Sequence, residues 1–467
     1  MMARNPGLIS RRSLLKMLGV GGAAVLVAAC QPKEVEGSVE EEVATKSGQA
    51  PVPAAEEVKT IRYLGGFGQS WEDFYNTEVL PKFYDLHPNY KVEMTLIGSW
   101  PDLYNKIVTS TAGGMPPEVT RQKDFFTPDF IVRGLQQELD EYVAAKAPHI
   151  AEDQYVPHAW SNMHWSGKLV ALPLLIFNHY PHFNIELYKK AGLVDSDGAP
   201  VAPDTWEDVR EQANKLKDPS NNVYGTFLRD EGGKEDTVNF FHVWLAQAGG
   251  RLIDEEFSRF MFNTPEGLDA LTFWVDLIKD GAMKPPGVSI EGIIPQGHVG
   301  MWWHASSYWV AYRRDNPDFE WSTAINPMRK TRGAIVRGDH HALFRQSKER
   351  DAGFDFLAFH QTPEITLAYG KNQMMIMPRY DVMSDAFYKE PYMGVPGAVY
   401  SVEFEQLEQP GNQPQPIFPG YQESSYKIGA QLILACMQEI SPEQALDQAE
   451  KEANDVLASA RRLLGVD

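Results

Sequence analysis

The chain has 467 residues, of which 63 are acidic and 43 are lysine or arginine, so its formal net charge is −20. A surface this acidic argues against nucleic acid or an anionic lipid surface as the partner. The length exceeds what a single hydrophobic core supports, and we therefore expect two lobes in the folded part.

The first 29 residues have the order of an export signal. Arg11 and Arg12 precede an apolar stretch, residues 17–29, that is too short to span a bilayer, which takes about 20 residues. The segment SRRSLLK resembles a twin-arginine export signal, and VAAC, which ends at Cys30, resembles a bacterial lipobox. The resemblance implies that residues 1–29 are removed. It also implies that Cys30 carries a lipid anchor, which would place the protein on the outer face of the cell membrane or in the periplasm.

The next segment, residues 30–58, is rich in Glu, Ala, Pro, Ser and Gly and almost lacks large apolar side chains. Such a segment cannot bury enough surface to offset its chain entropy, so we expect a disordered tether. The second cysteine, Cys436, lies in the apolar run AQLILACMQ, where we expect a buried helical thiol and no disulfide.

The folded body opens with a strand, a helix and a second strand. TIRYLGGFG, residues 60–68, indicates a strand that runs into a glycine-rich loop. Residues 71–86 have helical spacing of apolar side chains, and residues 90–98 alternate as a strand. This order predicts a βα unit within an α/β lobe.

Helices are predicted further along the chain. Thr205 is a candidate N-cap with Asp208 three residues later, an acidic variant of the capping box. Residues 267–281 place several leucines and Trp274 on one helical face, so Trp274 is predicted to lie in the core. Residues 349–361 and the C-terminal segment SPEQALDQAEKEANDVLASARRLL also have helical patterns.

Seven characteristic phrases follow one another along the chain. In order they are LPKFYDLHPNYKVEM, GMPPEVTRQKDFF, WSGKLVALPLLIFNHYPHFNIELYKKAGL, PDTWEDV, WLAQAGG, FNTPEGLDAL and GHVGMWW. Together they resemble the family 1 extracellular solute-binding proteins of ABC importers, the group that contains maltose-binding protein. The resemblance rests on collinearity, because each phrase alone is a general signature of the fold. Glu118, Ser166 and Phe183 stand where the family usually has Asp, Asp and Tyr.

This resemblance implies an α/β fold of the two-lobed, periplasmic-binding-protein-like (type II) class, in which each lobe is a sheet flanked by helices. The ligand cleft would lie between the lobes. The implied partners are a small carbohydrate, the permease subunits of an ABC transporter and the membrane through the lipid anchor, and a monomer is expected. The implied lobes are residues 59–173 with 332–380, and residues 174–331 with 381–467.

The stretch MWWHASSYW, residues 301–309, is the densest aromatic segment of the chain. Tryptophan and tyrosine offer flat apolar area with a polar edge, which suits the faces and hydroxyl groups of a sugar. In the family, the aromatic residue after this small-residue turn commonly stacks on a sugar ring, which implies a platform at Trp309. Core packing and a membrane-interface belt are the competing interpretations.

Other ligand contacts are expected from loops at strand ends, where α/β lobes bind their ligands. Competing structural roles are a helix cap at Gln69, helix packing at Trp244 and an exposed surface loop at residues 121–124. The full set of expected ligand-binding residues is Gln69, Trp71, Trp100, Arg121, Gln122, Asp124, Asn178, Tyr180, Asn239, Trp244, Trp303, Tyr308, Trp309, His340 and Tyr421.

Three other functional interpretations fit parts of the pattern. HYPH (residues 179–182) and His340 with His341 suggest a metal, but Pro181 breaks a helix and no carboxylate or cysteine cluster completes a site, so neither a metal nor a cofactor is expected. A secreted glycoside hydrolase is an alternative, because it would also need aromatic side chains and a carboxylate pair. A glycerol phosphodiester or a polyamine is an alternative solute, although the mixture of Arg, Asn, Gln and Trp favours a neutral polyol.

Overall fold

The described residues belong to one compact unit, Glu56–Asp467. Residues 1–29, Cys30 and nearly all of the expected tether lie outside them. No helix in the described part of the chain combines the length and apolar character needed to cross a bilayer. The computed structural model describes residues 57–66, 68–227, 233–287, 293–390 and 397–464.

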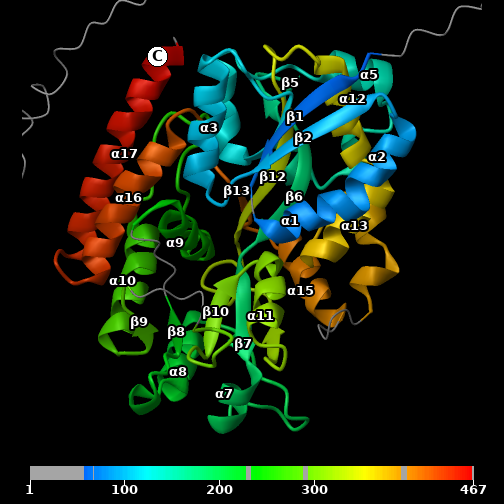
Figure 1. Ribbon diagram of the computed structural model, residues 1–467. Helices are drawn as coiled ribbons and strands as arrows, with labels where there is room; N and C mark the ends of the chain where they lie inside the picture. The colour runs from blue at the N-terminus through cyan, green and yellow to red at the C-terminus, as the bar shows by residue number, and fades with distance from the viewer. Residues whose placement is uncertain (1–56, 67, 228–232, 288–292, 391–396, 465–467) are drawn as a thin grey trace, which may run out of the picture. The chain divides into compact units, whose positions relative to one another are not determined.

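The larger sheet of the described chain has six strands (Figure 1). Its strands are β1 (Lys59–Gly65), β2 (Tyr90–Leu96), β3 (Val119–Lys123), β6 (Leu172–Asn178), β12 (Ile335–Leu343) and β13 (Gln413–Pro414). Their order is β13-β12-β3-β1-β2, with β6 beside β12. β1 runs parallel to β2 and β3, whereas β12 is antiparallel to β3 and β6. The predicted strand, helix and strand are confirmed, since α1 (Gln69–Phe74), η2 (Tyr75–Val79) and α2 (Leu80–Leu86) connect β1 to β2.

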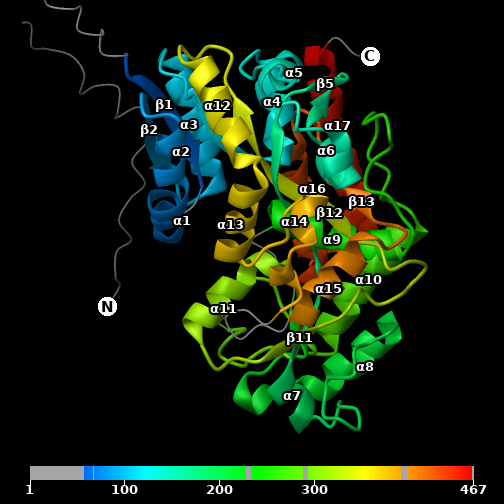
Figure 2. The same ribbon diagram turned by 90° about the vertical axis from the view of Figure 1, so that its right-hand side faces the viewer.

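Helices cover the larger sheet because its strands bury side chains on both faces. All five residues of β3, Val119–Lys123, are buried although successive side chains point to opposite faces. The predicted amphipathic helix at residues 349–361 is α12, which packs against β12, β1 and β3 (Figure 2). The bounds of α12 are Arg350–His360, and the other helices of this region are α3 (Trp100–Ala112), α4 (Thr127–Val132), α5 (Asp140–Lys146), α6 (Pro157–Ser161), α13 (Pro363–Gln373) and α14 (Tyr380–Met383).

A smaller antiparallel sheet has the order β10-β7-β11, with β7 (Tyr180–Asn184) in the middle. Its outer strands are β10 (Met301–His304) and β11 (Trp321–Thr323). Since β6 ends at Asn178 and β7 begins at Tyr180, the chain passes from the larger to the smaller sheet across one residue, His179. Shorter elements are η3 (Asp124–Phe126), η4 (Glu152–Gln154), β4 (His164–Trp165), β5 (Lys168–Leu169), α7 (Ile185–Lys190), η5 (Pro219–Asn221), β8 (Thr226–Phe227), β9 (Met283–Lys284), η6 (Ser306–Tyr308), α11 (Trp309–Asp315) and η7 (Ala386–Tyr388).

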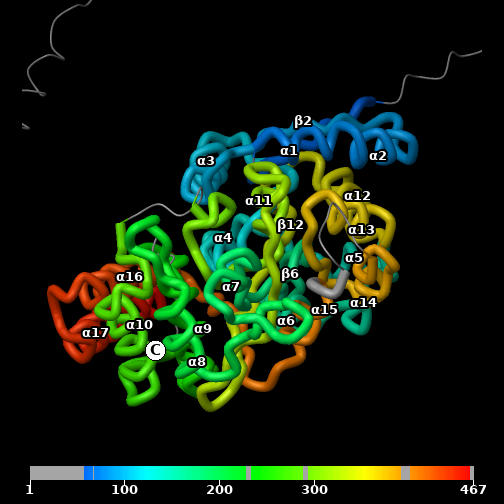
Figure 3. Tube along the Cα trace, turned by 90° about the horizontal axis from the view of Figure 1, so that it is seen from below, coloured from blue at the N-terminus to red at the C-terminus, as the bar shows by residue number. Residues whose placement is uncertain are grey.

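A second group of helices packs together as α9, α10, α16 and α17 (Figure 3). Trp274 and Cys436 are both buried within this group, as predicted. The capping box predicted at α8 is also confirmed, because Thr205 and Asp208 exchange side-chain and backbone hydrogen bonds. The bounds are α8 (Trp206–Leu216), α9 (Glu235–Gln247), α10 (Pro265–Lys279), α16 (Tyr421–Cys436) and α17 (Pro442–Leu464).

Helix α15 (Gly397–Leu407) is hydrogen-bonded to both chain segments that connect the larger sheet with the smaller one, namely the passage from β6 to β7 and the return from β11 to β12. Its Glu403 accepts a hydrogen bond from the hydroxyl of Tyr180, at 3.1 Å, just after the first connection. One turn later, Gln406 accepts from the backbone N–H of Asn326, at 2.7 Å, in the return connection between β11 and β12. Asn326 in turn donates to the carbonyl of His179, at 3.0 Å. Both connections are therefore held to one helix, beside the place where the candidate site lies.

Candidate functional site

A cavity of about 420 Å³ lies where β3, β6 and β12 meet the first turn of α9 and the segment before α11. Small-molecule sites have volumes of about 300–1,000 Å³. The described residues that line it are Trp71, Trp100, Arg121, Lys123, Leu175, Phe177, His179, Asp236, Ala305, Ser307, Tyr308, Ala311, Arg337, Asp339, Gln373 and Met375.

Aromatic side chains from separate elements converge on this cavity. Trp71 lies in α1, shortly after the loop that follows β1, and Trp100 is the first residue of α3. Ser99 caps α3 by accepting a backbone N–H of the first turn, which fixes where Trp100 leaves the strand-to-helix loop. Tyr308 ends η6, and its ring stacks on His304. All three were predicted from the sequence as ligand contacts, and the structure brings them to one cavity.

Arg121 and Asp339 form a buried ion pair on the neighbouring strands β3 and β12. Arg121 donates to Asp339 Oδ2 from Nε at 3.1 Å and from Nη2 at 2.5 Å, and its Nη1 donates to the carbonyl of Gly66 at 2.8 Å. The guanidinium lies 4.0 Å from the ring centroid of Trp71 and 5.5 Å from that of Trp100. The predicted contact Arg121 is therefore held in place by a carboxylate, a carbonyl and two aromatic faces.

Two further cations meet an acid pair at the start of α9. The Nζ atom of Lys123 lies 3.3 Å from both carboxylate oxygens of Glu235. Arg337 places Nη1 3.4 Å from Asp236 Oδ1 and Nη2 3.6 Å from Glu235 Oε1. Burial disfavours the charged guanidinium, but the nearby carboxylates keep the pKa of Arg337 above its ordinary value. Two basic side chains therefore meet two acidic ones at the start of α9.

Asn239 and Tyr421 were expected to contact ligand, but they are not among the described residues that line the cavity. They lie behind the acid pair instead. Asn239 Nδ2 donates to Glu235 at 3.1 Å and to Asp236 at 3.4 Å, and the hydroxyl of Tyr421 donates to Asn239 Oδ1 at 3.3 Å. Both residues orient the carboxylates of α9.

Asp124, another expected contact, is buried beneath the cavity and does not line it. Its carboxylate accepts the backbone N–H groups of Phe125 at 3.0 Å and of Gly338 at 3.1 Å. Burial raises the pKa of Asp124 to about 7, although Arg337 and the Gly338 hydrogen bond oppose the shift.

Gln122 and His340 lie on the opposite face of the sheet from Arg121 and Asp339, because side chains alternate along a strand. Gln122 bonds with Thr120 at 2.6 Å, and His340 Nε2 lies 2.7 Å from the hydroxyl of Thr127. Both residues are fully buried within the fold. Both residues were expected to contact ligand, but each lies one position away from the side chains that face the cavity and therefore points to the other face of the sheet.

The same alternation places Asn178 away from the cavity, whereas its neighbours Phe177 and His179 line it. Tyr180 is buried against Glu403 at the connection between the sheets. Trp303 donates from its indole N–H to Asn326 Oδ1 at 2.9 Å, in the return connection. These expected ligand contacts support the connections instead.

Trp309 is fully buried, which corrects its expected role as the stacking platform. Its indole N–H donates to His182 Nε2 at 2.8 Å, and its ring packs against Trp321 and Tyr400. Trp244 is likewise a core residue, lying against other tryptophan rings. Gln69 is exposed and bonds with Asp73 at 2.8 Å.

Sequence reasoning missed several lining residues, namely Lys123, Arg337, Asp339 and Asp236. Strand alternation could have identified three of them. Lys123 lies two residues beyond Arg121 on the same face of β3, and Arg337 and Asp339 share a face of β12. The pattern of α9 carries no comparable signal, because almost every residue of that helix is buried.

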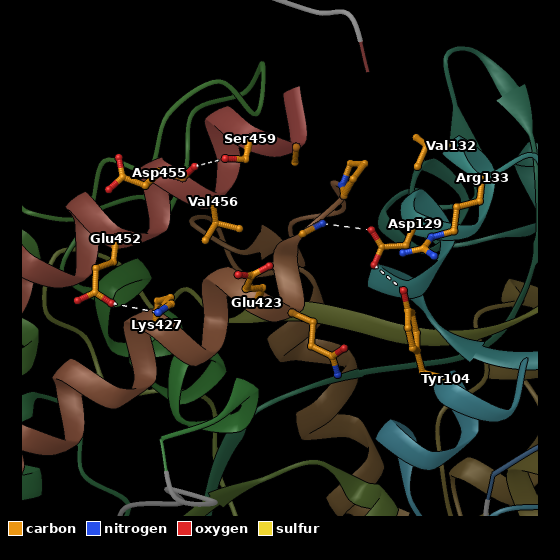
Figure 4. Close-up of a pocket in the computed structure, with 14 residues that line it drawn as sticks. Tyr104, Asp129, Val132, Arg133, Glu423, Lys427, Glu452, Asp455, Val456 and Ser459 are labelled. Carbon is orange, nitrogen blue, oxygen red and sulfur yellow. Dashed lines mark hydrogen bonds and ion pairs between the residues drawn. The ribbon is translucent and has the colours of Figure 1, made fainter. Parts of the chain in front are cut away.

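A larger cavity, of about 840 Å³, lies elsewhere among α3, α4, α16 and α17. In Figure 4, Asp129 faces Tyr104, whose hydroxyl donates to it at 3.2 Å. The backbone N–H of Gly420 also donates to Asp129, at 3.2 Å. Burial raises the pKa of Asp129. No residue predicted from the sequence lines this cavity, and its charged side chains, such as Lys427 and Glu452, are substantially exposed. We therefore assign the site to the smaller cavity, where buried aromatic and charged groups converge.

No group of three or more His, Cys, Asp or Glu side chains suited to a metal ion occurs within the described ranges. The cavity offers aromatic faces and charged groups that are already paired with one another or with Glu235. Such an arrangement suits a polar, uncharged solute, because each cation already has a carboxylate partner, with Glu235 serving Lys123 from behind the lining, and both kinds of group still donate or accept hydrogen bonds.

Known proteins of similar sequence and structure are solute-binding proteins. A protein of Brucella abortus, named only as a binding protein, is 22% identical over 292 residues, which are 61% of this chain and 68% of that one. A Thermotoga lettingae ABC transporter solute-binding protein with bound α-D-tagatose superposes with a TM-score of 0.74 at 22% identity, covering 85% of this chain and 100% of that one. A Listeria monocytogenes ABC substrate-binding protein in complex with cycloalternan has a TM-score of 0.73 at 20% identity, covering 88% and 100%.

These solved structures show that the chain has the two-lobed α/β fold of periplasmic sugar-binding proteins, as the sequence resemblance implied. The pattern of one family, described as bacterial extracellular solute-binding protein, matches residues 66–366. This match covers well over half of the chain, and the family binds solutes rather than converting them. The chain belongs to the bacterial extracellular solute-binding protein family.

Proposed function

We propose that this protein is the substrate-binding subunit of an ABC importer and that it captures a neutral carbohydrate in the cavity beside Trp71, Trp100 and Tyr308. The observation that carries the proposal is the convergence of these aromatic side chains with paired charges at one cavity. The tagatose and cycloalternan complexes of the two structural neighbours support a sugar, but they differ in ligand size.

The chemistry of the cavity supports a neutral ligand. A sugar presents apolar C–H patches to an aromatic ring and hydroxyl groups at its edge. Arg121 and Lys123 could donate to hydroxyl oxygens while Asp236 and Asp339 accept hydroxyl protons. An anionic or cationic solute would instead disturb ion pairs that are already formed. Among the alternatives, a glycerol phosphodiester and a polyamine fit less well for this reason.

We further propose that the lobes comprise residues 59–173 with 332–380 and residues 174–331 with 381–467. The return of the chain from β11 to β12 supports the boundary at 331/332, whereas the boundary at 173/174 falls inside β6, before the passage at His179. In this proposal the protein is a monomer. Its Cys30 carries lipid after export through the twin-arginine route, which keeps the protein on the outer face of the membrane near the permease.

A thermal-shift screen of mono- and oligosaccharides, followed by calorimetry, tests the proposal. We expect Trp100→Ala to weaken binding of the sugar found by about tenfold, since stacking and lost apolar area together are worth on the order of 1.4 kcal/mol. Trp160→Ala is the matched control, because Trp160 is also partly buried but does not line the cavity. Binding of phosphodiesters or polyamines alone would overturn the sugar assignment, and cleavage of the bound oligosaccharide would favour an enzyme.

A further inference from the structure

We propose that Glu235 and Asp236 form an electrostatic latch with Lys123 and Arg337 that closes the cavity and slows release of the solute. The inference rests on the proposed function, because closure traps a ligand between the proposed lobes. In that division, α9 belongs to one lobe, and β3 and β12 belong to the other. The four side chains therefore join the two sides of the cavity.

The geometry of these ion pairs differs from that of pairs within one sheet. Arg62 and Glu118 lie 2.7 Å apart beside β1 and β3, and Arg121 and Asp339 lie 2.5 Å apart on β3 and β12. The pairs that reach α9 have nitrogen–oxygen distances of 3.3 to 3.6 Å. Charge-assisted hydrogen bonds are typically about 2.7–2.9 Å long, so the pairs across the cavity are looser. Loose pairs between separate elements are the ones that can break when the lobes open.

Burial makes such a latch sensitive to the loss of one partner. All four side chains are at most 11% exposed. The desolvation of paired charges offsets much of their attraction, whereas a charge left without its partner in the closed form is strongly unfavourable. In an open form the same charge would be hydrated. Removing one partner should therefore destabilise the closed form specifically.

Asn239 holds the two carboxylates of the latch in position before the lobes close. It donates to both acids from within α9, and Tyr421 fixes its amide by donating to Oδ1. The carboxylates thus face the sheet in a set geometry, and less side-chain entropy is lost when the pairs form.

Glu235→Gln is the most informative variant, because Glu235 contacts both cations but is not among the described residues that line the cavity. We expect its radius of gyration without ligand, measured by solution scattering, to exceed that of the wild type. In the double variant Lys123→Met/Glu235→Gln, the radius of gyration should return toward that of the wild type, because no lysine is then left without its carboxylate partner. Glu118→Gln is the control, since it removes a buried glutamate from an ion pair on one side only.

The kinetic expectation is an off-rate for D-tagatose about tenfold faster in Glu235→Gln, with a nearly unchanged on-rate. Wild-type scattering and a wild-type off-rate in Glu235→Gln would overturn the latch while leaving carbohydrate binding intact. If D-tagatose does not bind, scattering alone decides: an expanded Glu235→Gln variant supports the latch, and an unchanged one rejects it. If Glu235→Gln does not fold, Asp236→Asn is tested by the same scattering measurement with the same two outcomes.

Discussion

The ring of Tyr308 lies against the ring of His304, with centroids 4.0 Å apart and an interplanar angle of 27°. His304 is buried, and its Nδ1 is hydrogen-bonded to the hydroxyl of Tyr312. That hydroxyl also accepts from the indole N–H of Trp302 at 2.9 Å, so Tyr312 links the Trp302 and His304 side chains. Trp302 and His304 therefore support the ring of Tyr308 at the cavity, whereas Trp303 and Trp309 are hydrogen-bonded elsewhere.

We predict that Tyr308→Ala weakens sugar binding by about tenfold with little loss of stability. The reason is that the substitution removes an aromatic face from the cavity, and this contact together with its apolar area is worth on the order of 1.4 kcal/mol. Calorimetry with the sugar from the screen measures the effect. Tyr380→Ala is the control, since Tyr380 is exposed and outside the cavity. Equal affinities in Tyr308→Ala and the wild type would remove Tyr308 from the site.

Trp309→Ala should behave in the opposite way. Truncating a fully buried tryptophan typically destabilises a fold by about 3–5 kcal/mol, and here the hydrogen bond to His182 is also lost. Urea unfolding should show this loss, while the protein that remains folded binds sugar normally. Trp309→Phe should retain part of the stability because a ring still fills part of the space. Unchanged stability together with weakened binding would restore Trp309 as a ligand contact.

Tyr308 and Trp309 show what could not be predicted from the sequence. The pattern predicted a ligand platform within residues 301–309 with Trp309 as the principal ring, whereas the structure places Tyr308 at the cavity and buries Trp309. A 3-10 turn, η6, leads directly into α11 at this point, and the direction of each side chain depends on where the helix begins. That boundary is set by tertiary packing around His182, which no local pattern contains.

The fold was more predictable than the site. Periodicity indicated β1, β2 and α12, and the family resemblance indicated the two-lobed architecture. Within β3, however, Arg121 was selected together with Gln122, although alternation allows only one of them to face the cavity. Asn239 and Tyr421 were predicted to contact ligand, but the structure shows that Asn239 is hydrogen-bonded to Glu235 and Asp236 and that Tyr421 is hydrogen-bonded to Asn239.

We predict that Cys30→Ser releases the protein from the membrane fraction without changing its affinity for sugar. The thioether-linked lipid is the expected anchor, and Cys30 lies outside the described cavity-forming residues. Fractionation followed by immunoblotting measures the distribution. The unchanged affinity is the internal control for correct folding. A variant that stays in the membrane fraction after a salt wash would contradict lipidation at this position.

The final prediction concerns the pH dependence of stability through Glu403. Its carboxyl is fully buried, and burial raises its pKa from an ordinary 4.5 to about 8, despite the opposing hydrogen bond from Tyr180. Between these two values the folded chain holds a proton that the unfolded chain has released. The unfolded state then binds fewer protons, so the free energy of unfolding decreases as pH rises from about 4.5 to 8, by up to about 1.36 kcal/mol per pH unit.

Glu403→Gln should flatten this slope, because an amide keeps the acceptor for Tyr180 but does not titrate. Urea unfolding at pH 6.5, 7.2 and 8.0 measures the difference between the two slopes. Buried histidines such as His182, whose pKa is lowered from 6.5 to about 3, still add a slope of opposite sign near pH 6.5, but they are present in both proteins. Asp124, whose pKa is raised to about 7, acts in the same direction as Glu403 and is also present in both, so the difference in slope reports Glu403. Parallel slopes in the wild type and in Glu403→Gln would mean that Glu403 is ionised in the folded protein. In that case its contact with Tyr180 would be a charge-assisted hydrogen bond at the connection between the two sheets.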